Sequence, residues 1–322
     1  MVKKVAILTS GGDAPGMNNA IRSLVRASRM HKIEAWLVFE GYKGLCQGQF
    51  ALASEYDVDA YINRGGTLIG SARFPEFTNL AVRKKALKEL SKRGIEALVV
   101  IGGDGSYRGA QALHEMGVKT IALPGTIDND INSSDFTIGY PTALQTIVEN
   151  IDRVRDTMES HRRIAIVEVM GHGCGDLALY SGLATGAEII VTNENLLSAK
   201  EIGLLAKKQF AKGKKSVIIV VSEMIFENLV KLEREVEKIS GRATRAMSFS
   251  HIQRGGVPGA IERINASRMG LKAIELLSQN QSGLAVGIVN SRTSAMPIME
   301  ALGRSRQDRA SKAQKYNRLN QA

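Results

Sequence analysis

The stretch EALVVIGGDGSYRGAQALHEM, residues 96–116, decides the fold class. Its aliphatic run, residues 97–101, lacks the polar alternation of a half-buried strand. Such a run is typical of a strand that is buried on both faces of a parallel sheet. A glycine-rich loop follows at residues 102–106, and the residues after it have helical spacing. The order of strand, glycine loop and helix predicts one unit of an α/β fold.

The same order recurs along the chain. Further aliphatic runs lie at residues 3–8, 119–124, 163–169, 216–221 and 284–289. Helices that join parallel strands make right-handed crossovers, so these runs predict open, mostly parallel sheets covered by helices. In such sheets ligands bind beyond the carboxyl ends of the strands, which is where the glycine-rich and acidic loops fall.

The composition is that of a globular chain. Its 322 residues, 44% of them hydrophobic, are enough for two domains with a core each. No apolar run is long enough to cross a bilayer, and the N-terminal run is too short for a signal peptide, so we expect a cytoplasmic protein without membrane contact. Cys46 and Cys174 suggest buried or half-buried residues rather than a disulfide or reactive thiols. The polar C-terminal stretch, residues 303–322, is expected to be a loosely ordered, solvated tail, with a binding arm as the alternative.

The net charge of +11 indicates an anionic partner, which could be nucleic acid, an anionic membrane surface or phosphorylated small molecules. Nucleic acid is disfavoured, because aromatic residues make up only 5% of the chain and the basic residues are dispersed rather than interleaved with aromatics. Many basic residues stand beside glycine loops, which favours phosphorylated small molecules.

The first glycine loop, TSGGDAPGMN at residues 9–18, precedes a helical pattern. Its glycines allow backbone N–H groups to approach an anion at a helix start. It is no Walker A loop, because Met17 and Asn18 stand where that motif needs Lys and Ser or Thr. A tight turn without ligand remains the alternative.

Two further loops carry carboxylates directly after strands. In GGDGS, Asp104 stands between glycines and suits a magnesium ion held beside phosphates. In PGTIDND, residues 124–130, Asp128 suits a base for an acceptor hydroxyl and Asp130 the metal side. Each also has an ordinary interpretation as a local turn or cap.

Basic side chains near these loops and strands form candidate clamps for anions. Guanidinium groups match phosphate oxygens in a bidentate manner, although any one arginine is most often a surface residue. Glu223 follows an aliphatic run and suits sugar hydroxyls, or else is an acid at a helix start. The clamp candidates are Arg73, Arg163, Arg245, His251 and Arg254.

Eight motifs, in their order along the chain, resemble bacterial ATP-dependent 6-phosphofructokinases. The resemblance covers nearly the whole chain, from residue 2 to about residue 303. It implies transfer of the γ-phosphoryl group of ATP to the 1-hydroxyl of fructose 6-phosphate, with Mg²⁺, by a cytoplasmic homotetramer in glycolysis. The motifs are GGDAPGMN (11–18), INRGGT (62–67), GSARFPEF (70–77), VVIGGDGS (99–106), LPGTIDND (123–130), VEVMG (167–171), RATR (242–245) and HIQRGG (251–256).

The resemblance also implies the domain organisation. Two three-layer, Rossmann-like α/β domains with mostly parallel sheets are expected, with the active site in the cleft between them. Residues 1–139 and 253–303 would form a larger ATP-binding domain. Residues 140–252 and 304–322 would form a smaller domain that binds fructose 6-phosphate.

Residue roles follow from the same resemblance. Asp128 matches the general base, and Asp104 and Asp130 match the metal site. The remaining catalytic positions are Gly12, Arg73, Thr126, Met170 and Gly171. The ATP site comprises Gly12, Arg73, Phe74, Gly103, Asp104, Gly105 and Ser106. The substrate site comprises Thr126, Ile127, Asp128, Arg163, Met170, Gly171, His172, Glu223, Arg245, His251 and Arg254, of which Arg163 and Arg245 cross a subunit interface.

The phosphoryl donor is the finer question. Relatives that use pyrophosphate carry bulkier charged residues at the positions of Gly105 and Gly125. Two glycines there are expected to leave room for ATP. The alternatives are a pyrophosphate-dependent enzyme, a kinase for another sugar phosphate, and a catalytically silent effector-binding subunit; Asp104 and Asp128, both present, argue against the last. A non-specific nucleic-acid binder is the remotest alternative.

An effector site for ADP and phosphoenolpyruvate is the family's regulatory feature. Arg22 and Arg26, one helical turn apart, form a reasonable anion clamp, although a solvated basic face is the ordinary interpretation. Two departures from the family pattern stand out: His172 replaces an arginine, and Ala60 replaces an acidic residue near Asp57 and Asp59. The predicted effector residues are Arg22, Arg26, Arg155, Gly186, Glu188, Lys212 and Lys214.

Overall fold

The computed structural model describes residues 2–305 and 308–322. The chain divides into two compact units. The first unit consists of Met1–Thr142 and Arg254–Ser305, and the second of Ala143–Gln253 and Arg306–Ala322. Residues 306 and 307, which fall within the predicted segment 304–322, lie outside the described residues.

The first unit is built on a mixed, mostly parallel sheet of eight strands. Its main path runs β12–β11–β5–β4–β1–β2–β3, and β6 pairs with β5. The edge strands β3 and β12 are antiparallel to their neighbours, and the other pairs are parallel. The strands are β1 (Lys4–Ser10), β2 (Glu34–Val38), β3 (Phe50–Leu52), β4 (Ala97–Gly102), β5 (Lys119–Thr126), β6 (Ile138–Gly139), β11 (Leu284–Val289) and β12 (Arg292–Pro297).

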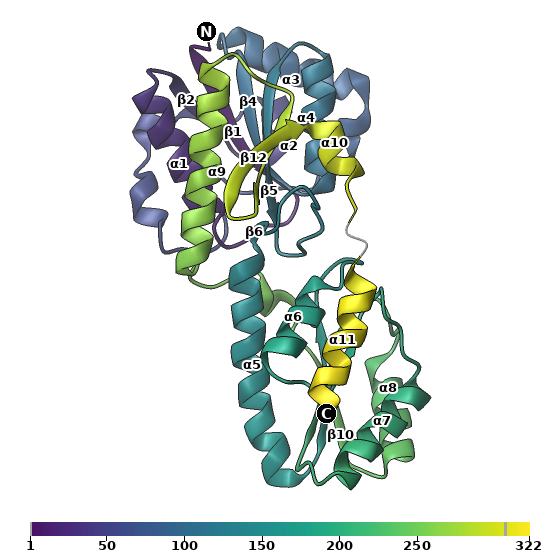
Figure 1. The fold of residues 1–322 in the computed structure, drawn as a ribbon. Helices are drawn as coiled ribbons and strands as arrows, with labels where there is room; N and C mark the ends of the chain where they lie inside the picture. The colour runs from purple at the N-terminus through teal and green to yellow at the C-terminus, as the bar shows by residue number, and fades with distance from the viewer. Residues whose placement is uncertain (1, 306–307) are drawn as a thin grey trace. The chain divides into compact units, whose positions relative to one another are not determined.

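Helices cover this sheet (Figure 1). One core cluster joins residues of α2, α3, α4 and α10 to alternate strand residues such as Leu8 and Leu98. Helices α1 and α9 pack on one another, and Ser23 of α1 donates a 2.5 Å hydrogen bond to the Ser267 carbonyl of α9. The helices are α1 (Met17–Met30), α2 (Gly41–Gln47), α3 (Leu80–Lys92), α4 (Asp104–Glu115), α9 (Ala260–Ser278) and α10 (Ile298–Gly303).

The register of the central strands places three loops at one edge of the sheet. Ser10 at the end of β1 pairs with Gly102 at the end of β4, and Gly102 pairs with Pro124 of β5. The strands are parallel, so the loops that follow them leave the sheet side by side. These loops contain the glycines and aspartates that were predicted from the sequence as candidate site residues.

The second unit has a four-stranded parallel sheet in the order β10–β7–β9–β8. Helices α7 and α8 share a core with one side of it, and α6 and α11 contact β8 and one another. The strands are β7 (Ile164–Val169), β8 (Ile189–Val191), β9 (Val217–Ser222) and β10 (Thr244–Ser248). The helices are α5 (Tyr140–His161), whose first three residues belong to the first unit, α6 (Asp176–Ala184), α7 (Ala199–Ala211), α8 (Leu229–Ser240) and α11 (Arg309–Gln321).

The expectation of a loose C-terminal tail is wrong. Residues 309–321 form α11, which packs against α6 and β8. Arg309 donates to the buried Asp176 carboxylate at 2.8 Å. Asn317 bonds both the N–H and the carbonyl of Ile190 at 2.8 Å. Polar contacts with strand and helix anchor this helix in place of an aliphatic stripe, and hydropathy alone therefore does not reveal it.

The predicted strands are confirmed at all six aliphatic runs. Cys46 is half-buried and Cys174 is buried, and burial raises the pKa of the Cys174 thiol to about 12, which keeps it protonated. Among the described residues, the helices are all too short or too polar to cross a bilayer.

Candidate active site

The loop after β1 contains glycines in left-handed conformations and contacts the side chain of Arg254. Gly11 and Gly16 adopt left-handed φ values of 90° and 99°, and α1 begins directly after Gly16. Gly12 lies against the guanidinium of Arg254, because a Cβ at position 12 would stand 2.5 Å from Nη1 of Arg254. That guanidinium also donates to the Asp13 carbonyl at 3.2 Å. The structure thus brings Gly12 and Arg254 together.

The segment of Arg73 and Phe74 lies beside the same loop. Gly11 N–H donates to the Ala72 carbonyl at 3.3 Å, and the Ser71 hydroxyl donates to the Gly11 carbonyl at 2.8 Å. The predicted nucleotide residues of two distant motifs are therefore neighbours in the fold.

The loop after β4 passes directly into a helix. Asp104 is the first residue of α4, and its carboxylate accepts from Arg108 at 3.0 Å. Ser106 donates to the Ser10 carbonyl at 3.1 Å, while the buried Tyr42 hydroxyl donates to the Ser106 carbonyl at 2.7 Å. These bonds fix the loop after β4 to the end of β1.

The loop after β5 holds Asp128 in a fixed orientation. The residue is only 8% exposed. Thr126 Oγ1 accepts from the Asp128 N–H at 3.2 Å and donates to its Oδ2 at 3.3 Å. Asn129 takes a left-handed φ of 53° and accepts from the Thr137 N–H at 3.0 Å, which closes the loop. Asp128 thus lies at the sheet edge on a short, internally bonded turn.

Carboxylate chemistry at this edge suits a magnesium ion that shares its ligands with phosphates. A Cβ on Gly103 would stand 4.0 Å from Cβ of Thr126, so the loops of Asp104 and Asp128 touch. The described residues contain no group of three or more His, Cys, Asp or Glu side chains that would hold an ion alone. Magnesium commonly takes one or two carboxylates together with substrate phosphates and water, which fits this arrangement.

Gly105 and Gly125, the two glycines expected to leave room for ATP, have different surroundings. At Gly105 a Cβ would meet no atom within 4 Å. At Gly125 it would lie 2.8 Å from Ile101, 2.9 Å from Met17 and 3.1 Å from the Gly102 nitrogen. Gly105 therefore borders open space, as expected, whereas packing within the protein already requires glycine at position 125.

The carboxyl edge of the second unit gathers most of the predicted substrate residues there. Glu223 Oε1 accepts from the N–H groups of Gly171 and His172 at 3.1 and 2.9 Å. The Met170 N–H donates to Gln253 Oε1 at 3.2 Å, and Gln253 lies in the short turn that contains His251. Residues after β7, β9 and β10 thus form one connected group.

Glu168 belongs to this edge and was not predicted. Burial raises the pKa of its carboxyl, a hydrogen bond with Ser248 lowers it, and the charge of Glu223 raises it again. The motif VEVMG, which contains Glu168, could have drawn attention to this residue. A single acid inside an aliphatic strand, however, forms no spacing pattern that predicts a site.

Arg163 and Arg245 do not join the group. Arg163 precedes β7, and Arg245 pairs in register with Ala165 near the start of that strand. A six-residue strand spans about 20 Å at roughly 3.3 Å per residue. Both arginines therefore lie toward the amino edge, away from Met170, and Arg245 lies within 3.8 Å of Glu233.

The predicted effector residues form one cluster in each unit. In the first unit, Asp59 accepts from Arg22 at 2.5 Å and also pairs with Arg26. Hydrogen bonds from Arg26 and Arg22 lower the pKa of the Asp59 carboxyl. An acid therefore stands beside both arginines, although Ala60 replaces the acidic residue of the family pattern. In the sequence analysis Asp59 was named only as a neighbour of Ala60.

In the second unit the cluster centres on Glu188, which is buried. Its Oε1 lies 3.3 Å from Lys214 and 3.8 Å from Arg155. Arg155 also donates to the Thr185 carbonyl at 2.7 Å, next to Gly186. Lys212 donates to the Gln321 carbonyl at the end of α11, so the C-terminal helix contacts this cluster.

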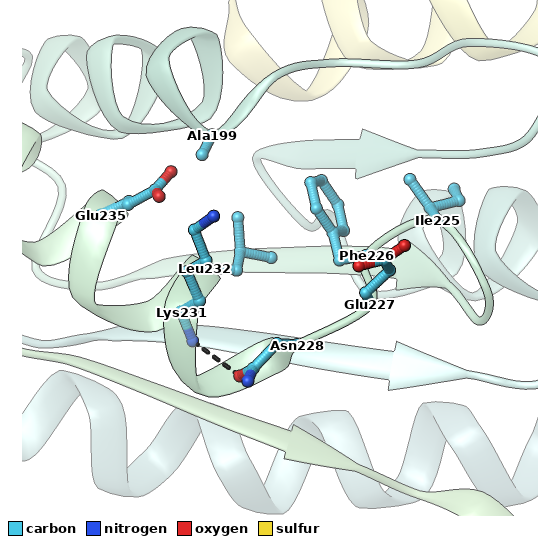
Figure 2. A pocket seen from close by; sticks show the side chains of 8 residues that line it. All are labelled: Ala199, Ile225, Phe226, Glu227, Asn228, Lys231, Leu232 and Glu235. Atoms are coloured by element: carbon cyan, nitrogen blue, oxygen red, sulfur yellow. Dashed lines mark hydrogen bonds between the residues drawn. The ribbon is translucent and has the colours of Figure 1, made fainter.

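A cavity of about 320 Å³ opens near the start of α8 (Figure 2). Its polar lining residues include Glu227, Lys231 and Glu235, and the Lys231 N–H donates to Asn228 at 2.9 Å. The predicted site residues are not among those that line it. The cavity belongs to the second unit, and its lining includes Ile225, two residues after Glu223.

Fold and site together define an α/β protein of the class that binds nucleotides and phosphates at the carboxyl ends of parallel strands. The chain belongs to the phosphofructokinase family, whose model matches residues 4–277. It is 56% identical over 326 residues to the ATP-dependent 6-phosphofructokinase of Mycoplasmopsis pulmonis, with 100% of both chains covered. The enzyme of that name from Vibrio cholerae is 51% identical over 302 residues, 94% of each chain.

Solved structures give the same family. The T-state crystal structure of Pichia pastoris phosphofructokinase matches with a TM-score of 0.93 and 30% identity. The match covers 99% of this chain and 39% of the Pichia chain, so this chain spans well under half of that relative. A pyrophosphate-dependent phosphofructokinase from Marinobacter aquaeolei shares the fold, with a TM-score of 0.83 at 20% identity and coverage of 98% and 91%.

Proposed function

We propose that this protein is an ATP-dependent 6-phosphofructokinase, which transfers the γ-phosphoryl group of ATP to the 1-hydroxyl of fructose 6-phosphate. The carrying observation is Asp128, a carboxylate held by Thr126 at the sheet edge where three glycine-rich and acidic loops meet. The family and the relatives named ATP-dependent 6-phosphofructokinase support this reaction over a pyrophosphate-dependent one.

Asp128 acts as the general base in this proposal. It accepts the proton of the 1-hydroxyl as that oxygen attacks the γ-phosphorus, and ADP leaves. Thr126 and the closed loop fix the direction of the carboxylate, so little reorganisation is needed at the moment of transfer. Ile127, buried beneath the loop, keeps the loop against the core.

The first unit is proposed to hold ATP, through Gly12, Arg73, Phe74 and the turn from Gly103 to Ser106. The N-terminus of α4 offers backbone N–H groups to phosphate oxygens. Asp104 and Asp130 would hold Mg²⁺, which when bound neutralises developing charge on the phosphates. Arg254, tied to Gly12 and Asp13, supplies a fixed positive charge beside them.

The second unit is proposed to hold the sugar phosphate. Glu223 orients the backbone of Gly171 and His172 and has acceptor capacity left for sugar hydroxyls. Arg163 and Arg245 are proposed to act in the site of a neighbouring subunit, which agrees with their place toward the opposite edge of the sheet. This role requires an oligomer, and we propose the homotetramer expected from the resemblance, in the cytoplasm.

Both clusters of predicted effector residues are proposed to bind ADP or phosphoenolpyruvate. Arg22, Arg26, Lys212 and Lys214 provide positive charge for their phosphates. Asp59 and Glu188 hold part of this charge in internal ion pairs, so an anionic effector must compete with carboxylates at both places.

The reaction is tested by identifying the product. We expect ³¹P NMR of protein with ATP, Mg²⁺ and fructose 6-phosphate to show a sugar 1,6-bisphosphate and ADP. Asp128→Ala should lower kcat by about 100-fold or more and leave ATP affinity, measured by calorimetry, within about threefold. A different phosphorylated position, or turnover of the variant within about tenfold of wild type, would refute the assignment.

A further inference from the structure

The N-terminal turns of two helices are joined by one buried carboxyl group, Glu262, that the proposed mechanism does not use. Glu262 is the third residue of α9 and only 1% exposed. Its Oε1 accepts from the Gly139 N–H at 2.9 Å. Its Oε2 accepts from the Thr142 N–H at 3.4 Å and from the Thr142 hydroxyl at 3.1 Å.

The contact is reciprocal. Thr142 is the third residue of α5, and its hydroxyl accepts from the N–H of Gly259, the residue before α9. Glu262 meanwhile bonds the N–H of Gly139, the residue before α5. In an ordinary capping box a helix satisfies its own first N–H groups with its own side chains. Here each helix supplies the side chain that satisfies the first turn of the other.

The same carboxyl group packs under the loop of Gly12. A Cβ on Gly16, which precedes α1, would lie 2.7 Å from Cγ of Glu262. At Gly139 a Cβ would lie 2.5 Å from Ala14 and 3.1 Å from Ile127, the neighbour of Asp128. The starts of α1, α5 and α9 therefore meet at Glu262, below the loops that carry the proposed catalytic groups.

We propose that Glu262 and Thr142 are positioning residues for phosphoryl transfer, which set the loops of Gly12 and Asp128 and the segment after Arg254 in register with one another. The proposal rests on the proposed function of those loops. Each loop has its own internal hydrogen bonds. The side chain of Glu262 contacts the base of all of them.

Burial of Glu262 agrees with this role. The pKa of its carboxyl is raised to about 7, because the effect of burial exceeds the opposite effect of the hydrogen bonds from Gly139 and Thr142. Among the described residues, Glu262 forms no ion pair, and burial of a carboxyl group without a cation is costly. An apolar residue or a simple cap would serve a merely structural helix contact better.

The test is a set of variants read for kcat and KM separately. In Glu262→Gln an amide NH₂ faces the Thr142 N–H, and in Thr142→Val the hydroxyl is lost. Each should lower kcat by about tenfold or more, with both KM values within about threefold, because misplaced reacting groups affect the transition state more than binding. Thr142→Ser keeps the hydroxyl and should retain kcat within about threefold. Glu275→Gln, on the same helix, is the matched control and should leave kcat unchanged.

Three results would overturn the proposal. One is a wild-type kcat in Thr142→Val or Glu262→Gln at a temperature where circular dichroism shows the variant folded. The second is an additive loss in the double variant, because residues that share one interaction are non-additive. The third is unchanged hydrogen exchange of residues 10–17 and 126–139 in both variants. If Glu262→Gln fails to fold, Thr142→Val decides. Wild-type turnover in the same assay tests the proposed function separately.

Discussion

At the scale of single residues, the two glycines near the proposed ATP site have different reasons for being glycine. Gly105 borders open space, and Gly125 has Ile101, Met17 and Gly102 where a Cβ would be. Gly125→Ala should therefore destabilise the fold by about 1–3 kcal/mol through overpacking, while Gly105→Ala should be near neutral. Thermal unfolding of both variants measures this. Equal melting temperatures would mean that space at the nucleotide, and not packing, explains both positions.

Glu262 links stability to pH with a definite sign. A glutamate carboxyl ordinarily has a pKa of 4.5, and in the folded protein the pKa of Glu262 is about 7, so between these values the folded state binds more protons than the unfolded state. Stability contributed by this group is therefore complete below about pH 4.5 and is lost as the pH rises through about 7.

The size of that loss can be measured against a variant that does not titrate. Relative to Glu262→Gln, the wild type should lose up to about 3 kcal/mol of unfolding free energy between pH 5 and pH 8. Urea unfolding at several pH values gives both curves. A difference between them that stays constant, or that grows with pH, would contradict the raised pKa.

Sequence reasoning proposed site residues that stand in recognisable loops and gave no signal for candidate residues within regular elements. Asp104 and Asp128 stand in glycine-containing loops that directly follow aliphatic strands, and this position marked them in the sequence. Glu262 stands at the third position of a helix, where a glutamate is ordinary, and only the fold reveals that its partners belong to another helix. Asp59 was named only as a neighbour of Ala60, because its two arginine partners lie far away in the sequence.

At the scale of elements, α11 depends on a buried ion pair. Arg309 donates to Asp176 at 2.8 Å, and its Nε lies 3.9 Å from Glu194. Arg309→Ala removes this charged partner from the buried Asp176 carboxylate and should cost about 3–5 kcal/mol. Arg318→Ala, at an exposed position of the same helix, should cost about 0.5 kcal/mol or less. Chemical denaturation compares them, and similar losses would show that the pair does not anchor the helix.

The aliphatic runs predicted the strands that are buried on both faces and missed the others. β2 and β10 contain exposed or polar residues, and β8 is only three residues long. The edge strands β3 and β12 are antiparallel, which a rule for parallel crossovers does not anticipate. The tail was mispredicted because Arg309 and Asn317 replace aliphatic packing with directed polar contacts.

At the scale of the whole molecule, the proposal that Arg163 and Arg245 act in the site of a neighbouring subunit can be tested by mixing variants. Asp128→Ala and Arg163→Ala should each be nearly inactive alone. Mixed and reassembled at equal amounts, they should recover about a quarter of wild-type activity, because half of the sites have Asp128 and half of those have a neighbour with Arg163. Recovery that does not exceed the sum of the parents, or a stable active monomer in light scattering, would exclude sharing.

The central claim is the use of ATP as phosphoryl donor to fructose 6-phosphate, and a coupled assay of aldolase type tests it most directly. The wild-type protein is given fructose 6-phosphate and Mg²⁺ with either ATP or pyrophosphate. We predict turnover with ATP and none above background with pyrophosphate. Turnover with pyrophosphate, or with neither donor while the protein is folded, would contradict the account.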